Sequence, residues 1–129
     1  MASGLPAATG DILTASTVNG LVTYTLNDQT GTTYTPVLTD QYQVLITRSN
    51  ASASTLTIPT NASVAFAVGT VITVLNKGAG AVVISAVTPG TTTVLSAGAT
   101  AASPSLAQYK SCALIKTATD TWYVVGAIA

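Results

Sequence analysis

Short runs of alternating apolar and polar residues recur from Leu21 to Ala127, and turn-forming residues separate them at intervals of about ten residues. Thr and Val dominate these runs, and both are β-branched residues that suit the pleated surface of a sheet. No stretch shows an amphipathic helical period of useful length. The pattern therefore predicts an all-β domain, either an antiparallel sandwich or a jelly-roll-like barrel of about eight short strands.

The first 20 residues differ from the rest of the chain. Small residues, Pro6 and Asn19-Gly20 interrupt them, and their periodicity is too weak for a buried element. We expect residues 1–20 to form an extended N-terminal arm and residues 21–129 to form one β-sandwich domain, since the chain is too short for two proper cores. The arm lacks the charged and apolar regions of a secretion signal, so we expect no export by that route.

A hairpin is predicted between residues 70–75 and 81–87. The connection Asn76-Lys77-Gly78-Ala79-Gly80 between them is typical of a tight antiparallel turn. No exact internal repeat of 20 to 50 residues is visible, so a solenoid is not expected.

A second hairpin is predicted at the C-terminal end, with residues 108–117 and 121–127 as its strands. The turn at Thr119-Asp120 should set the register between them. The side chains expected in the apolar interior are those of Ala113, Ile115, Trp122 and Val124.

Charged residues make up only 6% of the chain, against roughly 25% in an ordinary globular domain, and the formal net charge is zero. Nucleic-acid binding needs clustered Lys and Arg, and a membrane surface needs a basic amphipathic helix or a long apolar span. The sequence shows none of these, so we expect neither partner. So neutral a surface favours self-association, which predicts that a permanent assembly covers much of it.

Residues able to carry catalysis or bind a metal are scarce, because the chain has no His and no Glu. The four aspartates fall in the arm or in predicted turns, where Asp commonly hydrogen-bonds its own backbone. Cys112 lies in an apolar strand without a His to activate it, and we expect a small buried hydrophobe. We therefore expect no enzyme, cofactor or metal. The aspartates are Asp11, Asp28, Asp40 and Asp120.

Trp122 and Tyr123 are the candidate ligand-binding aromatics. They are adjacent on one predicted strand, so their side chains point to opposite faces. Packing in the core or at a subunit contact is one interpretation, and a platform on which a glycan stacks is the other.

From Tyr34 onwards, about three quarters of the chain resembles a β-domain that recurs in minor structural proteins of tailed phages, including tail-fibre, receptor-binding and capsid decoration proteins. The resemblance lies in the order and spacing of several segments, which are 34–40 (YTPVLTD), 54–59 (STLTIP), 66–74 (FAVGTVITV), 78–84 (GAGAVVI), 113–116 (ALIK) and 121–126 (TWYVVG).

The resemblance implies a virion structural role, commonly as a homotrimer, without a cofactor or transferable catalytic residues. Because the chain consists of the domain and a short arm, we expect a capsid decoration (cement) protein on the outer head surface, made in the host cytoplasm. The expected partner is the major capsid protein of the same phage, contacted by Leu5, Ile12 and Leu13 of the arm. The alternative is a tail-fibre or tail-tip knob that binds a host-surface glycan or protein, with Trp122 and Tyr123 as its platform.

Overall fold

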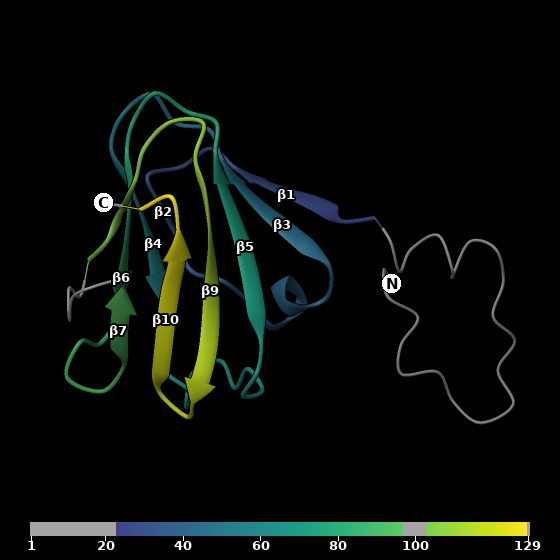
Figure 1. Ribbon diagram of the computed structural model, residues 1–129, viewed down its shortest axis with the longest axis vertical. Coiled ribbons are helices and arrows are strands. Elements are labelled where there is room, and N and C mark those ends of the chain that lie inside the picture. The colour runs from purple at the N-terminus through teal and green to yellow at the C-terminus, as the bar shows by residue number, and fades with distance from the viewer. Residues whose placement is uncertain (1–22, 97–102, 129) are drawn as a thin grey trace, which may run out of the picture.

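The computed structural model describes residues 23–96 and 103–128, which fold into two sheets packed face to face (Figure 1). The six-stranded sheet has the spatial order β1 (Thr25–Gln29), β3 (Val44–Arg48), β5 (Val71–Asn76), β9 (Ser111–Ala118), β10 (Thr121–Gly126) and β7 (Thr93–Ser96). The four-stranded sheet has the order β2 (Thr33–Tyr34), β4 (Ser54–Ile58), β6 (Val82–Ala86) and β8 (Ser105–Leu106). A short 3-10 helix, η1 (Leu38–Gln41), connects β2 to β3. The predicted all-β sandwich is confirmed.

The pairing within the sheets is mixed, where antiparallel pairing was expected. Strands β1 to β6 alternate between the two sheets, so β1, β3 and β5 pair in parallel, as do β2, β4 and β6. The first half of the chain thus winds like a short solenoid, although the sequence has no exact repeat. Its coils differ in length, because 19 residues separate Thr25 from its partner Val44 and 28 separate Leu45 from its partner Thr73.

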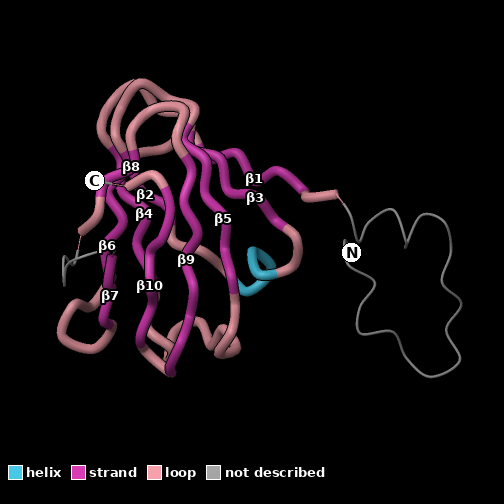
Figure 2. Tube along the Cα trace, in the orientation of Figure 1, coloured by secondary structure: helices cyan, strands magenta, loops and turns pink. Residues whose placement is uncertain are grey.

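The predicted hairpin between β5 and β6 does not form, because these strands belong to different sheets. The glycine-rich connection crosses from one sheet to the other and stacks on the preceding crossover (Figure 2). The backbone N–H of Gly80 donates to the carbonyl of Asn50 at 3.0 Å, and a Cβ atom on Gly80 would overlap the backbone of Ser52. Glycine is therefore required there by close backbone approach rather than by a hairpin turn.

The C-terminal hairpin of β9 and β10 is confirmed, but the predicted inward face of β9 is wrong. Residues directly opposite each other in an antiparallel pair share a face, and Trp122 lies opposite Lys116 while Val124 lies opposite Leu114. Ile115 therefore lies opposite Tyr123 on the outer face. The register shift between Thr121 and Trp122 moves β9 by one residue relative to the expectation.

The core lies between the sheets and draws on both. Alternation places every second residue of β4, β5, β6 and β9 inward, which is the period-2 pattern that the sequence shows. Its fully buried aliphatic side chains are those of Ile46, Leu56, Ile58, Ile72, Val74, Val82, Ile84, Leu106, Leu114 and Val124.

Candidate docking surface

The three aspartates in the part of the chain that the structure describes do not gather at one site. Asp28 lies on β1, Asp40 on η1 and Asp120 in the β9–β10 turn. Within the described ranges, no three His, Cys, Asp or Glu residues gather where they could hold a metal ion. Cys112 is buried and unpaired, as predicted, and burial raises the pKa of its thiol to about 12. Such a thiol is a poor nucleophile at neutral pH.

A buried carboxylate fastens η1 to the first strands. Asp40 accepts hydrogen bonds at Oδ2 from the hydroxyl of Tyr34 at 2.6 Å and from the backbone N–H of Val37 at 2.9 Å. Its Oδ1 accepts one from Nδ2 of Asn27 at 2.9 Å. Three donors around one carboxylate satisfy a charge that would otherwise be costly to bury. This network sets the position of η1 beside β1.

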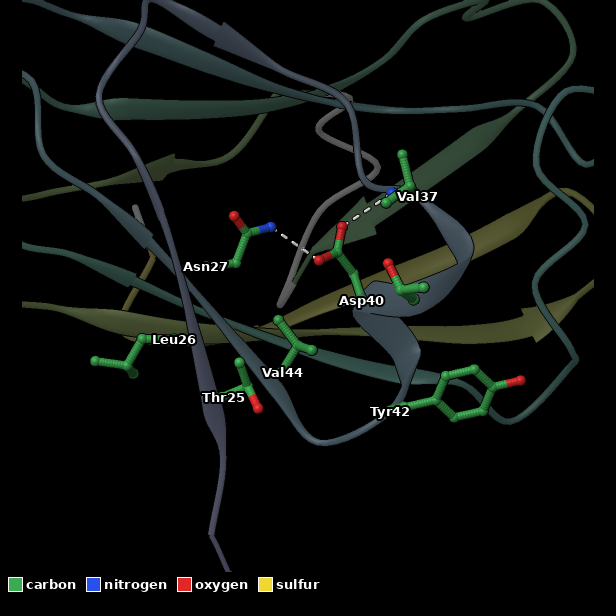
Figure 3. A pocket seen from close by; sticks show the side chains of 8 residues that line it. Thr25, Leu26, Asn27, Val37, Asp40, Tyr42 and Val44 are labelled. Carbon is green, nitrogen blue, oxygen red and sulfur yellow. Dashed lines mark hydrogen bonds between the residues drawn. The ribbon is translucent and has the colours of Figure 1, made fainter. Parts of the chain in front are cut away.

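Beside this network lies an open groove of about 770 Å³, which we name the β1–η1 groove (Figure 3). Its wall includes apolar side chains from three separate segments: Leu26 of β1, Val37 and Tyr42 on either side of η1, and Val44 of β3. The complete lining is Thr25, Leu26, Asn27, Val37, Thr39, Asp40, Tyr42 and Val44.

Strand β1 shows an inverted pattern of polarity. Its polar residues Asn27 and Gln29 are half-buried, whereas Leu26 is 63% exposed and the preceding Tyr24 is 58% exposed. A strand at the surface of a sandwich normally turns its apolar side chains inward. The inversion therefore leaves large apolar side chains exposed on the outward side of β1.

Within residues 23–96 and 103–128, one edge of β1 is not paired with another strand. Among the described residues β1 pairs only with β3, where the N–H of Thr25 donates to the carbonyl of Gln43 and the carbonyl of Gln29 accepts from Ser49. Backbone groups alternate sides along a strand, so those of Leu26 and Asp28 point to the free edge. An exposed edge of this kind can pair with a strand from another chain.

Charge at this edge is already neutralised. The carboxylate of Asp28 accepts hydrogen bonds from the hydroxyls of Thr47 and Ser49, at 2.7 Å and 2.8 Å, and lies 3.4 Å from Nζ of Lys77. These hydroxyl hydrogen bonds, with a smaller effect of Lys77, lower the pKa of Asp28. A partner covering the edge need not supply a matching charge.

The sequence-predicted contact residues Leu5, Ile12 and Leu13 lie outside the described residues, as does the predicted arm of residues 1–20. Residues 1–22 join the described chain at Thr23, immediately before β1. The groove itself was not predicted, because its lining comes from segments that are separate in sequence. The available signal was the alternation of the apolar residues Tyr24 and Leu26 with polar residues in the first strand, because these two side chains line the exposed side of β1.

The structure corrects the prediction that Trp122 and Tyr123 could together form an aromatic platform for a glycan. Trp122 is 2% exposed and packs edge to face against Phe66, so its ring cannot stack on a glycan. Tyr123 lies on the outer face of β10 and is 42% exposed. The opposite directions of the two side chains, which the sequence predicted, place one in the core and leave only Tyr123 accessible.

Two further findings bear on function. No helix in the described ranges has the length and apolarity needed to span a membrane. Comparison of the chain with protein-family models, with curated proteins and with solved structures found no match.

Proposed function

We propose that this chain is a non-enzymatic structural protein of a phage particle, a capsid decoration protein that binds the outer surface of the head and bridges major capsid subunits. The observation that carries the proposal is the inverted β1 strand beside the β1–η1 groove. A free strand edge, exposed apolar side chains and a neutralised charge meet at one end of the sandwich. That combination suits a permanent protein contact rather than a soluble surface.

We propose that the capsid shell occupies the groove. The arm residues proposed to contact the capsid belong to residues 1–22, which join the described chain at Thr23, next to β1 and the groove. Leu5, Ile12 and Leu13 would then contact the capsid together with Leu26 and its neighbours. A protein that binds one conformation of the shell stabilises that conformation. Attachment through the arm and the groove should therefore stabilise the assembled head. The homotrimer remains part of the proposal, with each subunit contact burying more than ~1,000 Å².

Co-sedimentation with undecorated heads tests this proposal. A negative charge introduced by Leu26→Asp should abolish or strongly weaken binding, since it places an unpaired carboxylate in an apolar contact. The matched control is Val87→Asp, which alters an exposed valine beyond β6 in the other sheet. Deletion of residues 2–16 should also weaken binding. Equal binding by the wild type and Leu26→Asp would contradict the groove as the capsid contact.

A tail-fibre or tail-tip knob is the second candidate, and Tyr109 favours it. This residue is 78% exposed and has a φ of 66°, a left-handed conformation that is costly for a residue with a side chain. A strained loop holding an aromatic ring in solvent is typical of a binding site. If this candidate is correct, Tyr109→Ala should reduce attachment of the protein to host cells, whereas a decoration protein should show no such attachment.

A further inference from the structure

Lys116 is a lysine whose amine lies in the core. It points inward from β9 and is 1% exposed, and its Nζ donates hydrogen bonds at 2.6 Å to Oδ1 of Asn61 and to the carbonyl of Phe66. Lysine is almost never fully buried without a partner. Here the hydrogen-bond partners are a carboxamide and a backbone carbonyl, rather than the carboxylate of an ion pair.

The ring of Trp122 lies beside this amine. Phe66 and Trp122 are both buried and meet edge to face, with ring centroids 5.6 Å apart, and Nζ lies 5.9 Å from the centre of the Trp122 ring. Removal from water disfavours the charged ammonium, so burial lowers the pKa of Lys116, while the charge of Asp120 opposes part of this effect. The site thereby favours the neutral, nucleophilic amine more than a solvent-exposed site does.

Asn61 contacts this amine through its side chain and a carboxylate through its backbone. The backbone N–H of Asn61 donates to Oδ1 of Asp120 at 2.8 Å, and the hydroxyl of Thr92 donates to the same oxygen at 3.2 Å. Asp120 therefore fixes the backbone of Asn61 while Lys116 contacts its side chain. An amine and a carboxamide are thus in contact, and a carboxylate that acts on the charge of the amine binds the same asparagine; the groups come from two segments of the chain, the loop after β4 and the β9–β10 hairpin.

We propose that Lys116 and Asn61 form an intramolecular isopeptide bond between Nζ and Cγ. The ammonium of Lys116 gives one proton to the carboxylate of Asp120, and the neutral amine attacks Cγ of Asn61. The Cγ–Nδ2 bond then breaks as a second proton passes from the attacking nitrogen to Nδ2. Nδ2 leaves as ammonia and takes up the proton held by Asp120. The products are one amide bond and one ammonium ion, with no change in oxidation state.

The contact between the amine of Lys116 and the carboxamide of Asn61 favours this reaction. Ordinary amide aminolysis is slow in water, but groups held in contact within one fold react as if at very high concentration. Nζ already touches the carboxamide oxygen, one bond from the carbon that it attacks. Asp120 can both accept and return the proton, which is the role of a general acid–base group.

The bond would join the two sheets covalently. Asn61 follows β4 of the four-stranded sheet, and Lys116 belongs to β9 of the six-stranded sheet, 55 residues further along the chain. A cross-link of this span restricts the unfolded chain more than the folded one and so stabilises the fold. A small domain without a disulfide in its described part would gain a permanent covalent cross-link.

Mass spectrometry of the folded, full-length protein tests the proposal. The intact mass should be lower than the sequence mass by one ammonia molecule. Trypsin cleaves after Lys and Arg, so a free Lys116 gives separate peptides 49–77, 111–116 and 117–129. The isopeptide bond should instead give 49–77 joined to 111–129, because the modified Lys116 is no longer cleaved. An intact mass equal to the sequence mass overturns the proposal.

Controls separate this bond from other losses of ammonia. A succinimide formed by Asn61 alone also loses ammonia but leaves the peptides unlinked, and that result overturns the proposal as well. Lys116→Arg keeps a cation but removes the amine, and Asp120→Asn removes the proton acceptor; both should restore the full mass. The matched control Asn50→Ala, which alters a turn asparagine elsewhere, should retain the linked peptides.

Discussion

Tyr34 shows how a single hydroxyl supports the groove. It donates to Asp40 and accepts from Nδ2 of Asn27, so it links β1, β2 and η1. Desolvation, reinforced by the neighbouring carboxylate of Asp40, raises the pKa of Tyr34 to about 12. The folded protein therefore keeps this proton at a pH where the unfolded chain, with the ordinary value of 10.0, has lost it.

This difference predicts a specific alkaline sensitivity. The contribution of Tyr34 to stability should be complete below pH 10 and should be lost as the pH rises towards about 12, because only the folded state binds the proton in that window. Tyr34→Phe should cost about 1.5–3 kcal/mol at pH 7, the usual value for a hydrogen bond to a charged group. It should also flatten the decline in stability above pH 10. Urea unfolding across pH 7 to 11 measures both, with the exposed Tyr24→Phe as control.

Residue-level expectations succeeded where local context decides and failed where it does not. The buried, free Cys112 was predicted from its apolar neighbours. The inward direction of Lys116 was not predicted, because a charged residue in a strand normally faces water. Only the tertiary contacts with Asn61 and Phe66 make its burial possible.

At the level of elements, variants in β9 test which residues of this strand face the core. Leu114 is fully buried opposite Val124, whereas Ile115 lies on the outer face opposite Tyr123. Leu114→Ala should therefore destabilise the domain by about 2–5 kcal/mol, the usual cost of a cavity in a core. Ile115→Ala should cost clearly less. Thermal or urea unfolding of both variants decides the matter, and the reverse order would mean that the register of β9 is wrong.

The stacked crossovers provide a second test at this level. An added methyl group at Gly80 would overlap the backbone of Ser52, and neither backbone can move without disturbing its own coil. Gly80→Ala should therefore destabilise the protein by more than about 2 kcal/mol. Gly90 lies in another turn with open space around it, so Gly90→Ala should have little effect. Similar melting temperatures for the two variants would show that the crossovers are not closely stacked.

Strand positions could be predicted because alternation is a local property of the sequence. Pairing could not, since a run such as Thr70–Leu75 fits equally well beside an antiparallel neighbour or a parallel one. The glycine-rich segment after β5 is compatible with a hairpin, and only its contact with Asn50 and Ser52 shows that it crosses between sheets. Long-range stacking, which alternation does not report, determined this part of the fold.

At the scale of the whole molecule, the stacked crossovers and the β1 edge differ in how their backbone groups are paired. Backbone hydrogen bonds join the stacked crossovers, whereas β1 has one edge that no other described strand pairs with, beside apolar side chains. Low charge alone predicted that the chain belongs to an assembly, but it did not indicate which surface is covered. The β1–η1 groove, which we propose as the covered surface, depends on three segments that Asp40 brings together, and sequence reasoning had placed Asp40 only in a turn.

The most direct test of the decoration proposal is the copy number of the protein in purified particles of the phage that we propose encodes it. Quantitative mass spectrometry can compare its abundance with that of the major capsid protein. A protein that bridges capsid subunits across the head should be present in numbers comparable to the subunits that it covers. A copy number that is a small fraction of this, as for a tail fibre or a tail tip, would contradict the account.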